Sequence, residues 1–277
     1  MNETVAGPFL KRGAIMIGSK TQWIWRLLMG LCIVGMICSA YVIVSADREY
    51  ARGDAAYEEV RTLKETPKQP AKPKPVSDTN AVSDSRSGEE TQVDFAALAL
   101  VNPDVVAWIK GDGSPIDYPV VQGKDNRYYL KHLFNGKANG MGSPFVDYRT
   151  PGDFSGKNTI IYGHHMKNGS MFASLAKYKK QAYYDDHPLM RLYTPEGSYA
   201  VELFAGLVAD GKEEFIRRSF DDDDDFLAYV DALKAESTFR SDVTLQAGER
   251  IVALVTCTYE YTNARYALFG KLAPLAN

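Results

Sequence analysis

The sequence predicts a mainly β protein, a closed β-barrel with short N-terminal helices and an inserted helix near Phe226–Ala235, carried behind a membrane anchor. Many short apolar runs are separated by turn residues, and one uncharged apolar run is long enough to cross a bilayer. Of the 277 residues, 45% are hydrophobic, which is enough for a packed core. The formal net charge of −3 offers no basic field for phosphates, so no nucleic acid partner is expected.

The first element is the uncharged run at residues 27–46, which predicts a transmembrane helix behind an N-terminal tail of residues 1–26. At about 1.5 Å per helical residue the run matches a hydrocarbon core of about 30 Å, and Trp23 and Trp25 precede it at interface positions. A cleaved signal peptide is the alternative, although its apolar region is usually only about 7–15 residues long. Lysine and arginine are balanced on the two sides, so the positive-inside rule does not decide the orientation.

Residues 47–92 are expected to form a stalk and then a disordered spacer rich in proline, lysine and serine. The stalk has a mostly polar helical pattern as far as Lys64, with a thin apolar stripe formed by Tyr50, Tyr57, Val60 and Leu63. From residue 66 to residue 92 there is almost nothing to bury. The folded unit is therefore expected at residues 93–277, as one domain.

This domain is expected to open with two short helices and to continue as a series of strands. Asp94 can cap the first helix, and Asn102 and Pro103 open the second. Short apolar runs bounded by turn residues predict strands at residues 119–121, 144–147, 159–163, 190–193, 199–208, 250–256 and 266–272. Helical patterns interrupt the strands at residues 171–178 and at Phe226–Ala235.

Cys257 is the first candidate for chemistry, because it closes the apolar strand predicted at residues 250–256. Cys32 and Cys38 lie in the membrane run, so the domain has one thiol and no internal disulfide. A cysteine at a strand end can serve as a nucleophile. The alternative is a structural cysteine, since free cysteines are among the most buried residues.

His164 ends a second apolar strand and is the candidate proton-transfer partner. Side chains alternate along a strand, so His164 shares a face with Tyr162, while His165 points to the other face. This alternation argues against a metal site built from both histidines, and the sequence predicts neither a metal nor another cofactor. A structural or exposed histidine is the alternative, and His132 and His187 are expected at the surface.

Arg265 follows Cys257 by eight residues, at the start of the last predicted strand. If the two strands form a hairpin around the polar loop between them, the arginine returns beside the cysteine. A guanidinium there can donate hydrogen bonds to an oxyanion or to a substrate carbonyl. The alternative is a solvent-facing arginine paired with a carboxylate.

The acidic run Asp221–Asp225 precedes the helix predicted at Phe226–Ala235. Carboxylates at a helix N-terminus interact favourably with the helix dipole, which is a sufficient explanation. A calcium site is the alternative, but consecutive carboxylates point in different directions.

Several motifs follow one another in order along residues 93–277: Ile116–Gln122, Asp125–Leu130, Gly142–Arg149, Tyr162–Phe172, and Leu254–Cys257 with Arg265. Together they closely resemble class B sortases, the membrane-anchored cysteine transpeptidases of Gram-positive bacteria. The resemblance implies a sortase-type barrel in which Cys257 is the nucleophile, His164 its partner and Arg265 the third catalytic residue. The family's T-L-x-T-C signature reads Ala253–Cys257 here, with alanine in place of the leading threonine and Val255 where serine is common.

The same resemblance implies an activity, partners and a location. The enzyme would cleave the C-terminal sorting signal of a secreted protein at a threonine carbonyl, form a thioester on Cys257 and pass the protein to an amine. That amine would come from a peptidoglycan precursor or from a pilin lysine. The chain would cross the cell membrane once, with a cytoplasmic N-terminus and an extracellular catalytic domain. The alternatives are a hydrolytic cysteine peptidase and a non-catalytic barrel that binds the cell wall.

Overall fold

The computed structural model describes residues 19–64, 93–210, 216–257 and 264–275. Among them, the residues up to Arg48 form one compact unit, and those from Glu49 onward form another that holds the β-barrel. The long helix α1 (Ser19–Lys64) contributes to both units. The spacer predicted after Lys64 lies outside the described residues.

The N-terminal part of α1 is the one helix in the described ranges that is long and apolar enough to cross a membrane. Its large apolar side chains are exposed rather than packed, as in Leu31 and Ile37. An apolar surface of this length is unfavourable in water and stable in a hydrocarbon core. The helix is therefore compatible with the predicted single-pass anchor.

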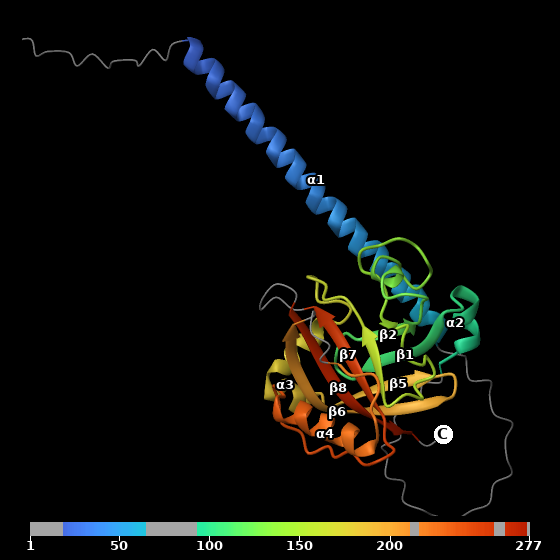
Figure 1. Ribbon diagram of the computed structural model, residues 1–277. Coiled ribbons are helices and arrows are strands. Elements are labelled where there is room, and N and C mark those ends of the chain that lie inside the picture. Colours follow the sequence, from blue (N-terminus) through green and yellow to red (C-terminus); the bar gives the residue numbers. More distant parts are fainter. Residues whose placement is uncertain (1–18, 65–92, 211–215, 258–263, 276–277) are drawn as a thin grey trace, which may run out of the picture. The chain divides into compact units, whose positions relative to one another are not determined.

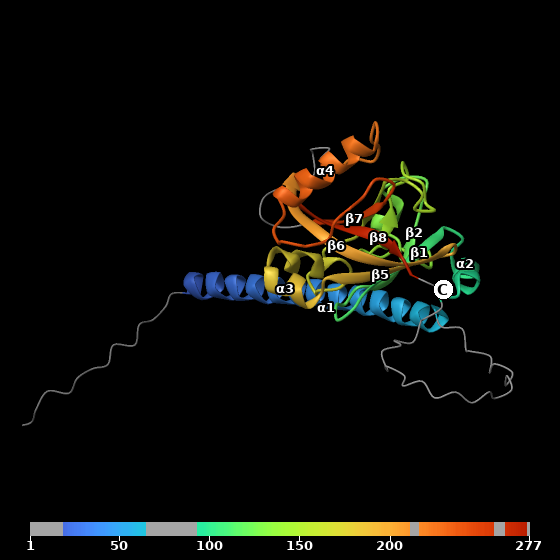
Figure 2. The ribbon, with the colours of Figure 1, turned by 90° about the horizontal axis from the view of Figure 1, so that it is seen from below.

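Eight strands of the described chain close into a barrel in the order β1-β2-β3-β4-β7-β8-β6-β5. Figure 1 and Figure 2 show the barrel from two directions. The strands are β1 (Val105–Gly111), β2 (Asp117–Val121), β3 (Phe145–Val146), β4 (Asn158–Tyr162), β5 (Leu189–Thr194), β6 (Gly197–Asp210), β7 (Ile251–Cys257) and β8 (Ala264–Pro274). Neighbours are antiparallel except for two parallel pairs, β2 with β3 and β4 with β7. Closure pairs β1 with β5 and removes the exposed sheet edges.

The predicted closed barrel is confirmed, and each predicted strand is present. The short helices and turns between the strands are α2 (Phe95–Val101), η1 (Tyr128–Leu130), η2 (Ala173–Lys179) and α3 (Gln181–Asp186). The second entry helix expected after Asn102 is wrong, because that segment leads into β1. Pairing with β2 and β5 buries Trp108 and Ile109 completely, and this burial outweighs the local preference of Pro103 for a first helical turn.

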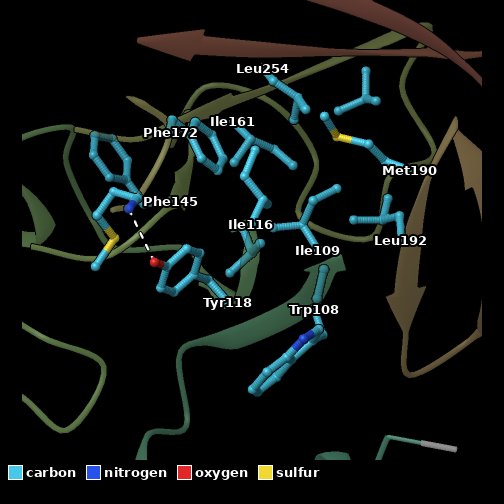
Figure 3. Packing of buried hydrophobic residues seen from close by; sticks show 14 of the residues in the cluster. Trp108, Ile109, Ile116, Tyr118, Phe145, Ile161, Phe172, Met190, Leu192 and Leu254 are labelled. Carbon is cyan, nitrogen blue, oxygen red and sulfur yellow. Dashed lines mark hydrogen bonds between the residues drawn. The ribbon is translucent and has the colours of Figure 1, made fainter. Parts of the chain in front are cut away.

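The barrel interior is filled by branched and aromatic side chains from opposite strands. In Figure 3, Ile109, Ile161, Leu192 and Leu254 converge within one hydrophobic cluster, and each is fully buried. Full burial of one such side chain stabilises the fold by about 1.5–3 kcal/mol. The strands that carry the site residues are thus fixed to a rigid core.

The helix α4 (Asp223–Ala235) covers a second hydrophobic cluster on the outer face of the barrel. Its buried residues Phe226 and Val230 pack in this cluster with Val255 of β7 and Phe269 of β8. The inserted helix predicted near Phe226–Ala235 is confirmed.

The acidic run before this helix acts as a cap and as a set of ion-pair partners. Asp222 is the N-cap and accepts a hydrogen bond from the Asp225 backbone nitrogen at 2.8 Å. Arg217 donates to both carboxylate oxygens of Asp225, and Lys157 pairs with Asp223. Within the described ranges, no cluster of three or more histidine, cysteine or acidic side chains could hold a metal ion.

The segment Glu49–Lys64 of α1, named the docked segment below, packs against the barrel. Tyr57 and Val60 are 2% and 3% exposed and belong to the interior hydrophobic cluster. The predicted apolar stripe is therefore present, but it is not the stripe of a separate stalk, and a folded unit that starts at residue 93 leaves it out. A thin stripe also fits an exposed stalk, because the sequence alone does not reveal the barrel surface that covers it.

Candidate active site

Two of the predicted site residues face each other across one β-ladder. Cys257 is the last residue of β7, and its antiparallel register partner in β8 is Arg265. The ladder runs without a shift from Ile251 opposite Lys271 to this pair. The hairpin expected from the eight-residue spacing is therefore present, with residues 258–263 of its loop outside the described chain.

The third residue follows the neighbouring strand on the other side of β7. β4 pairs in parallel with β7 and joins Tyr162 to Val255, and the Gly163 backbone nitrogen donates to the Val255 carbonyl at 3.0 Å. If this register continued for two residues beyond the end of β4, His164 would be level with Cys257. The strand order β4-β7-β8 thus gathers all three predicted residues at one end of the barrel.

Gly163 is required at its position by close packing. A Cβ atom there would lie 2.5 Å from Cδ2 of Phe172, whose ring is fully buried in the interior cluster. A larger residue would push the backbone away from this ring, and His164 would move with it.

His164 is half-buried and held by a backbone carbonyl. Its Nε2 lies 2.7 Å from the carbonyl oxygen of Leu130. A carbonyl oxygen only accepts hydrogen bonds, so Nε2 carries a proton in this contact. The other ring nitrogen, Nδ1, is then the atom able to gain and lose a proton in chemistry.

The remaining histidines lie in other surroundings. His165 forms an isolated bridge with Met171, beyond the end of β4. His132 stacks on Tyr128 with ring centroids 4.0 Å apart, and His187 stacks on Tyr183 at 4.2 Å. The sequence predicted that both lie at the surface, but both are half-buried.

A polar group that the sequence did not single out lies beside the β4 end. Tyr162 donates a hydrogen bond to Asp147 Oδ2 at 3.2 Å, and Arg149 pairs with the same carboxylate at 2.7 Å. Burial raises the pKa of Tyr162 to about 12, with the nearby Asp147 carboxylate as the second cause. Burial alone would raise the pKa of Asp147, but the Arg149 hydrogen bonds outweigh it and lower that pKa. The Asp147–Arg149 spacing was visible in the sequence, but its nearness to Tyr162 required the β3–β4 pairing.

A closed barrel that gathers a cysteine, a histidine and an arginine at the ends of three adjacent strands has the architecture of a sortase-type transpeptidase. Comparison with known families agrees: residues 111–273 match the sortase domain. The chain belongs to the sortase family, and its relatives place it in class B.

Two curated relatives are both named Sortase B. The protein of Staphylococcus aureus is 34% identical over 190 residues, which cover 68% of this chain and 78% of the relative. The protein of Listeria monocytogenes is 38% identical over 185 residues, which cover 66% of this chain and 75% of the relative.

Solved structures give the same result. A Staphylococcus aureus sortase B–substrate complex has a TM-score of 0.62 at 34% identity and covers 66% of this chain and 85% of that one. Clostridium perfringens sortase B has the same TM-score and identity and covers 65% of this chain and 99% of that one. The chain is therefore a sortase transpeptidase, an enzyme class that acts on sorting-signal substrates and amine nucleophiles.

Proposed function

We propose that Cys257, His164 and Arg265 are the catalytic residues of this transpeptidase. The observation that carries the proposal is the strand order β4-β7-β8, together with the pairing of Cys257 with Arg265 in the β7–β8 register. Side chains at one end of adjacent strands can reach one substrate carbonyl. The proposal assigns each of the three a separate part of the reaction.

In the first half of the reaction, the Cys257 thiolate attacks the carbonyl carbon of a threonine in the sorting signal. The carbon–nitrogen bond breaks, and the departing amine takes a proton from the His164 imidazolium. Arg265 donates hydrogen bonds to the oxyanion or holds the peptide carbonyl. The product is a thioester on Cys257.

In the second half, an amine attacks the thioester carbonyl and gives a proton to His164. The carbon–sulfur bond breaks and the Cys257 thiolate is restored, so no cofactor is consumed. The Leu130 carbonyl accepts from Nε2, and this contact leaves Nδ1 to exchange the proton in both halves.

The partners of the proposed reaction are a secreted protein with a C-terminal sorting signal and an amine of the cell wall or of a pilin. The Staphylococcus aureus structure is a sortase B–substrate complex, and this similarity supports a substrate-binding role for the present chain. The proposed topology is a single membrane crossing with a cytoplasmic N-terminus and an extracellular catalytic domain. The apolar helix from Trp23 onward supports the crossing.

Product analysis tests this assignment. The full chain in detergent is incubated with sorting-signal peptides and candidate amines, and the products are separated and identified by mass spectrometry. The expected product joins the threonine carbonyl to the amine, and Cys257→Ala should form none. A product released only by water would support a hydrolytic peptidase instead, and no product with any peptide would support a binding role.

A further inference from the structure

The docked segment packs against the barrel through one helical face. Gly53, Tyr57, Val60 and Lys64 recur at helical spacing and are all buried. A Cβ atom on Gly53 would lie 2.2 Å from the sulfur of Met141, so the helix and the 131–143 loop are in close contact there. The docked segment therefore lies against the loop that follows Leu130, the residue whose carbonyl contacts His164.

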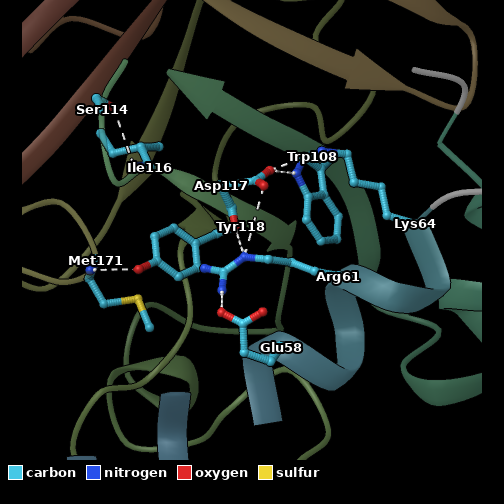
Figure 4. A network of polar contacts seen from close by, with 9 residues as sticks. All are labelled: Glu58, Arg61, Lys64, Trp108, Ser114, Ile116, Asp117, Tyr118 and Met171. Carbon is cyan, nitrogen blue, oxygen red and sulfur yellow. Dashed lines mark hydrogen bonds and ion pairs between the residues drawn. The ribbon is translucent and has the colours of Figure 1, made fainter. Parts of the chain in front are cut away.

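The end of the docked segment is fixed to β2 by a polar network, which Figure 4 shows. Lys64 Nζ lies 3.0 Å from Asp117 Oδ1, and the indole nitrogen of Trp108 donates to the same oxygen at 2.6 Å. Arg61 donates to the Asp117 backbone carbonyl at 3.1 Å. Lys64 is 3% exposed, so this charged group is held by its partners rather than by water.

A first route leads from Tyr57 to the carbonyl that holds His164. The Tyr57 hydroxyl donates to the Gly142 carbonyl and lies 2.9 Å from Ser143 Oγ. Ser143 in turn donates its backbone nitrogen to the Tyr129 carbonyl at 2.9 Å and its hydroxyl to the His132 carbonyl at 3.2 Å. These two carbonyls lie on either side of Leu130, whose own carbonyl accepts from His164.

Gly142 makes this first route possible. Its φ is +59°, and a Cβ atom there would lie 2.4 Å from the Tyr129 carbonyl oxygen. The backbone of residues 142–143 therefore packs directly on the segment that contains Leu130.

A second route leads from the docked segment to the loop that follows His164. The rings of Tyr118 and Tyr57 meet edge to face, with their centroids 5.1 Å apart. The Arg61 guanidinium carbon lies 5.2 Å from the centroid of the Tyr118 ring. The Tyr118 hydroxyl accepts a hydrogen bond from the Met171 backbone nitrogen at 3.1 Å. The next residue, Phe172, donates its nitrogen to the His164 carbonyl at 2.9 Å.

Met171 needs this support because its φ is +56°, a conformation that non-glycine residues rarely adopt. Such a conformation persists where surrounding contacts impose it. Burial raises the pKa of Tyr118 and of Tyr57, so both phenols are neutral at ordinary pH and keep their hydroxyl protons.

We propose that Tyr57 and Tyr118 are positioning residues for His164, and that the docked segment fixes the catalytic imidazole through them. Tyr57 fixes the Leu130 carbonyl that orients Nε2, and Tyr118 fixes the 164–172 loop. The proposal rests on the catalytic role proposed for His164. It makes the docked segment a part of the site's support as well as a part of the core.

The test compares three tyrosine-to-phenylalanine variants of the full chain in detergent. Tyr57→Phe and Tyr118→Phe each remove one hydroxyl and keep the ring. Tyr178→Phe is the matched control, because Tyr178 is buried and donates to the His187 carbonyl at 2.9 Å, away from both routes. Turnover is measured with KM, and the His164 ring is followed by nitrogen NMR with labelled histidine.

Tyr57→Phe and Tyr118→Phe should each lower kcat by about 10-fold with KM nearly unchanged, since a small displacement of a catalytic group is costly. The His164 ring signals should shift in both variants and stay unchanged in Tyr178→Phe. Equal losses of kcat in all three variants, or unchanged His164 signals, would overturn the proposal. His164→Ala separates the two claims. If that variant keeps its turnover, the catalytic role of His164 fails, while the His164 ring signals in Tyr57→Phe and Tyr118→Phe still report whether the two tyrosines position the ring.

Discussion

The two halves of the proposed site are held in place by different kinds of structure. Cys257 and Arg265 oppose each other in a regular ladder between two long strands, with α4 packed behind them. His164 lies beyond the end of β4, and contacts from Leu130 and Phe172 hold it there. The pairing of Cys257 with Arg265 joins residues eight apart in the sequence, whereas the Leu130 carbonyl that holds His164 lies 34 residues away. The comparison teaches that a short motif can contain the catalytic groups without containing what orients them.

The largest expected effect is on the His164 half. His164→Ala should abolish transpeptidation, because it removes the group proposed to protonate the leaving amine and to accept the proton of the incoming one. His165→Ala is the adjacent control and should keep much of the activity. Turnover on a sorting peptide with circular dichroism as a folding check measures both. Equal losses in two folded variants would contradict the separate roles of the two histidines.

The variant Arg265→Lys tests the half of the site formed by Cys257 and Arg265 on the β7–β8 ladder, called the ladder half. A planar guanidinium fork aimed at an oxyanion cannot be reproduced by an ammonium group, so we expect a rate loss of about 10²–10³, the scale of one lost oxyanion donor. An exposed ion pair is worth only about 0–1 kcal/mol, and lysine would keep its charge. The melting temperature should be unchanged. A variant with most of the wild-type turnover would exclude Arg265 from the site.

Removal of the docked segment tests its contribution to stability and to the support of His164. A chain that begins at residue 93 loses the burial of Tyr57 and Val60, which is worth at least about 3 kcal/mol at about 1.5 kcal/mol for each side chain. We expect it to unfold at lower denaturant than a chain that begins at residue 49. Its kcat should also fall, since the first route loses Tyr57 and the second loses the contacts of Tyr118 with Tyr57 and Arg61. Equal stability of the two chains in urea titrations would show that the docked segment is dispensable.

The smallest effect is expected from loss of the N-cap of α4, the helix that packs on β7 and β8. Asp222→Ala removes the N-cap of α4 and should cost about 1 kcal/mol of unfolding free energy, with turnover unchanged. Asp224→Ala is the control, because Asp224 is exposed in the first turn and is not the cap. Chemical denaturation of both variants gives the difference. A loss of activity in Asp222→Ala would mean that α4 affects the ladder half directly.

The sequence was sufficient for the elements whose cause is local. Apolar runs and turn residues predicted the strands, and the eight-residue spacing predicted the pairing of Cys257 with Arg265. β1 was missed, because its burial depends on β2 and on the distant β5. The docked segment was interpreted as a stalk, since its apolar stripe shows a buried face but not the surface that buries it.

For the site, too, the sequence revealed the features with a local pattern and missed those that depend on distant contacts. The three catalytic candidates were found from strand ends and from motifs that resemble class B sortases. The supports of His164 were not found, because Tyr57 is separated from Gly142 by 85 residues and Tyr118 from Met171 by 53. Contacts at such separations depend on the closed barrel, and one sequence does not contain a local pattern for them.

The central claim is that Cys257 carries the acyl group between the two substrates. The most direct test is the intact mass of the full chain after brief mixing with a sorting peptide and no amine, followed by digestion to locate the adduct. We predict a thioester adduct on Cys257 that disappears when an amine is added, with the peptide recovered as an amide. An adduct on another residue, or turnover in Cys257→Ala, would contradict the account.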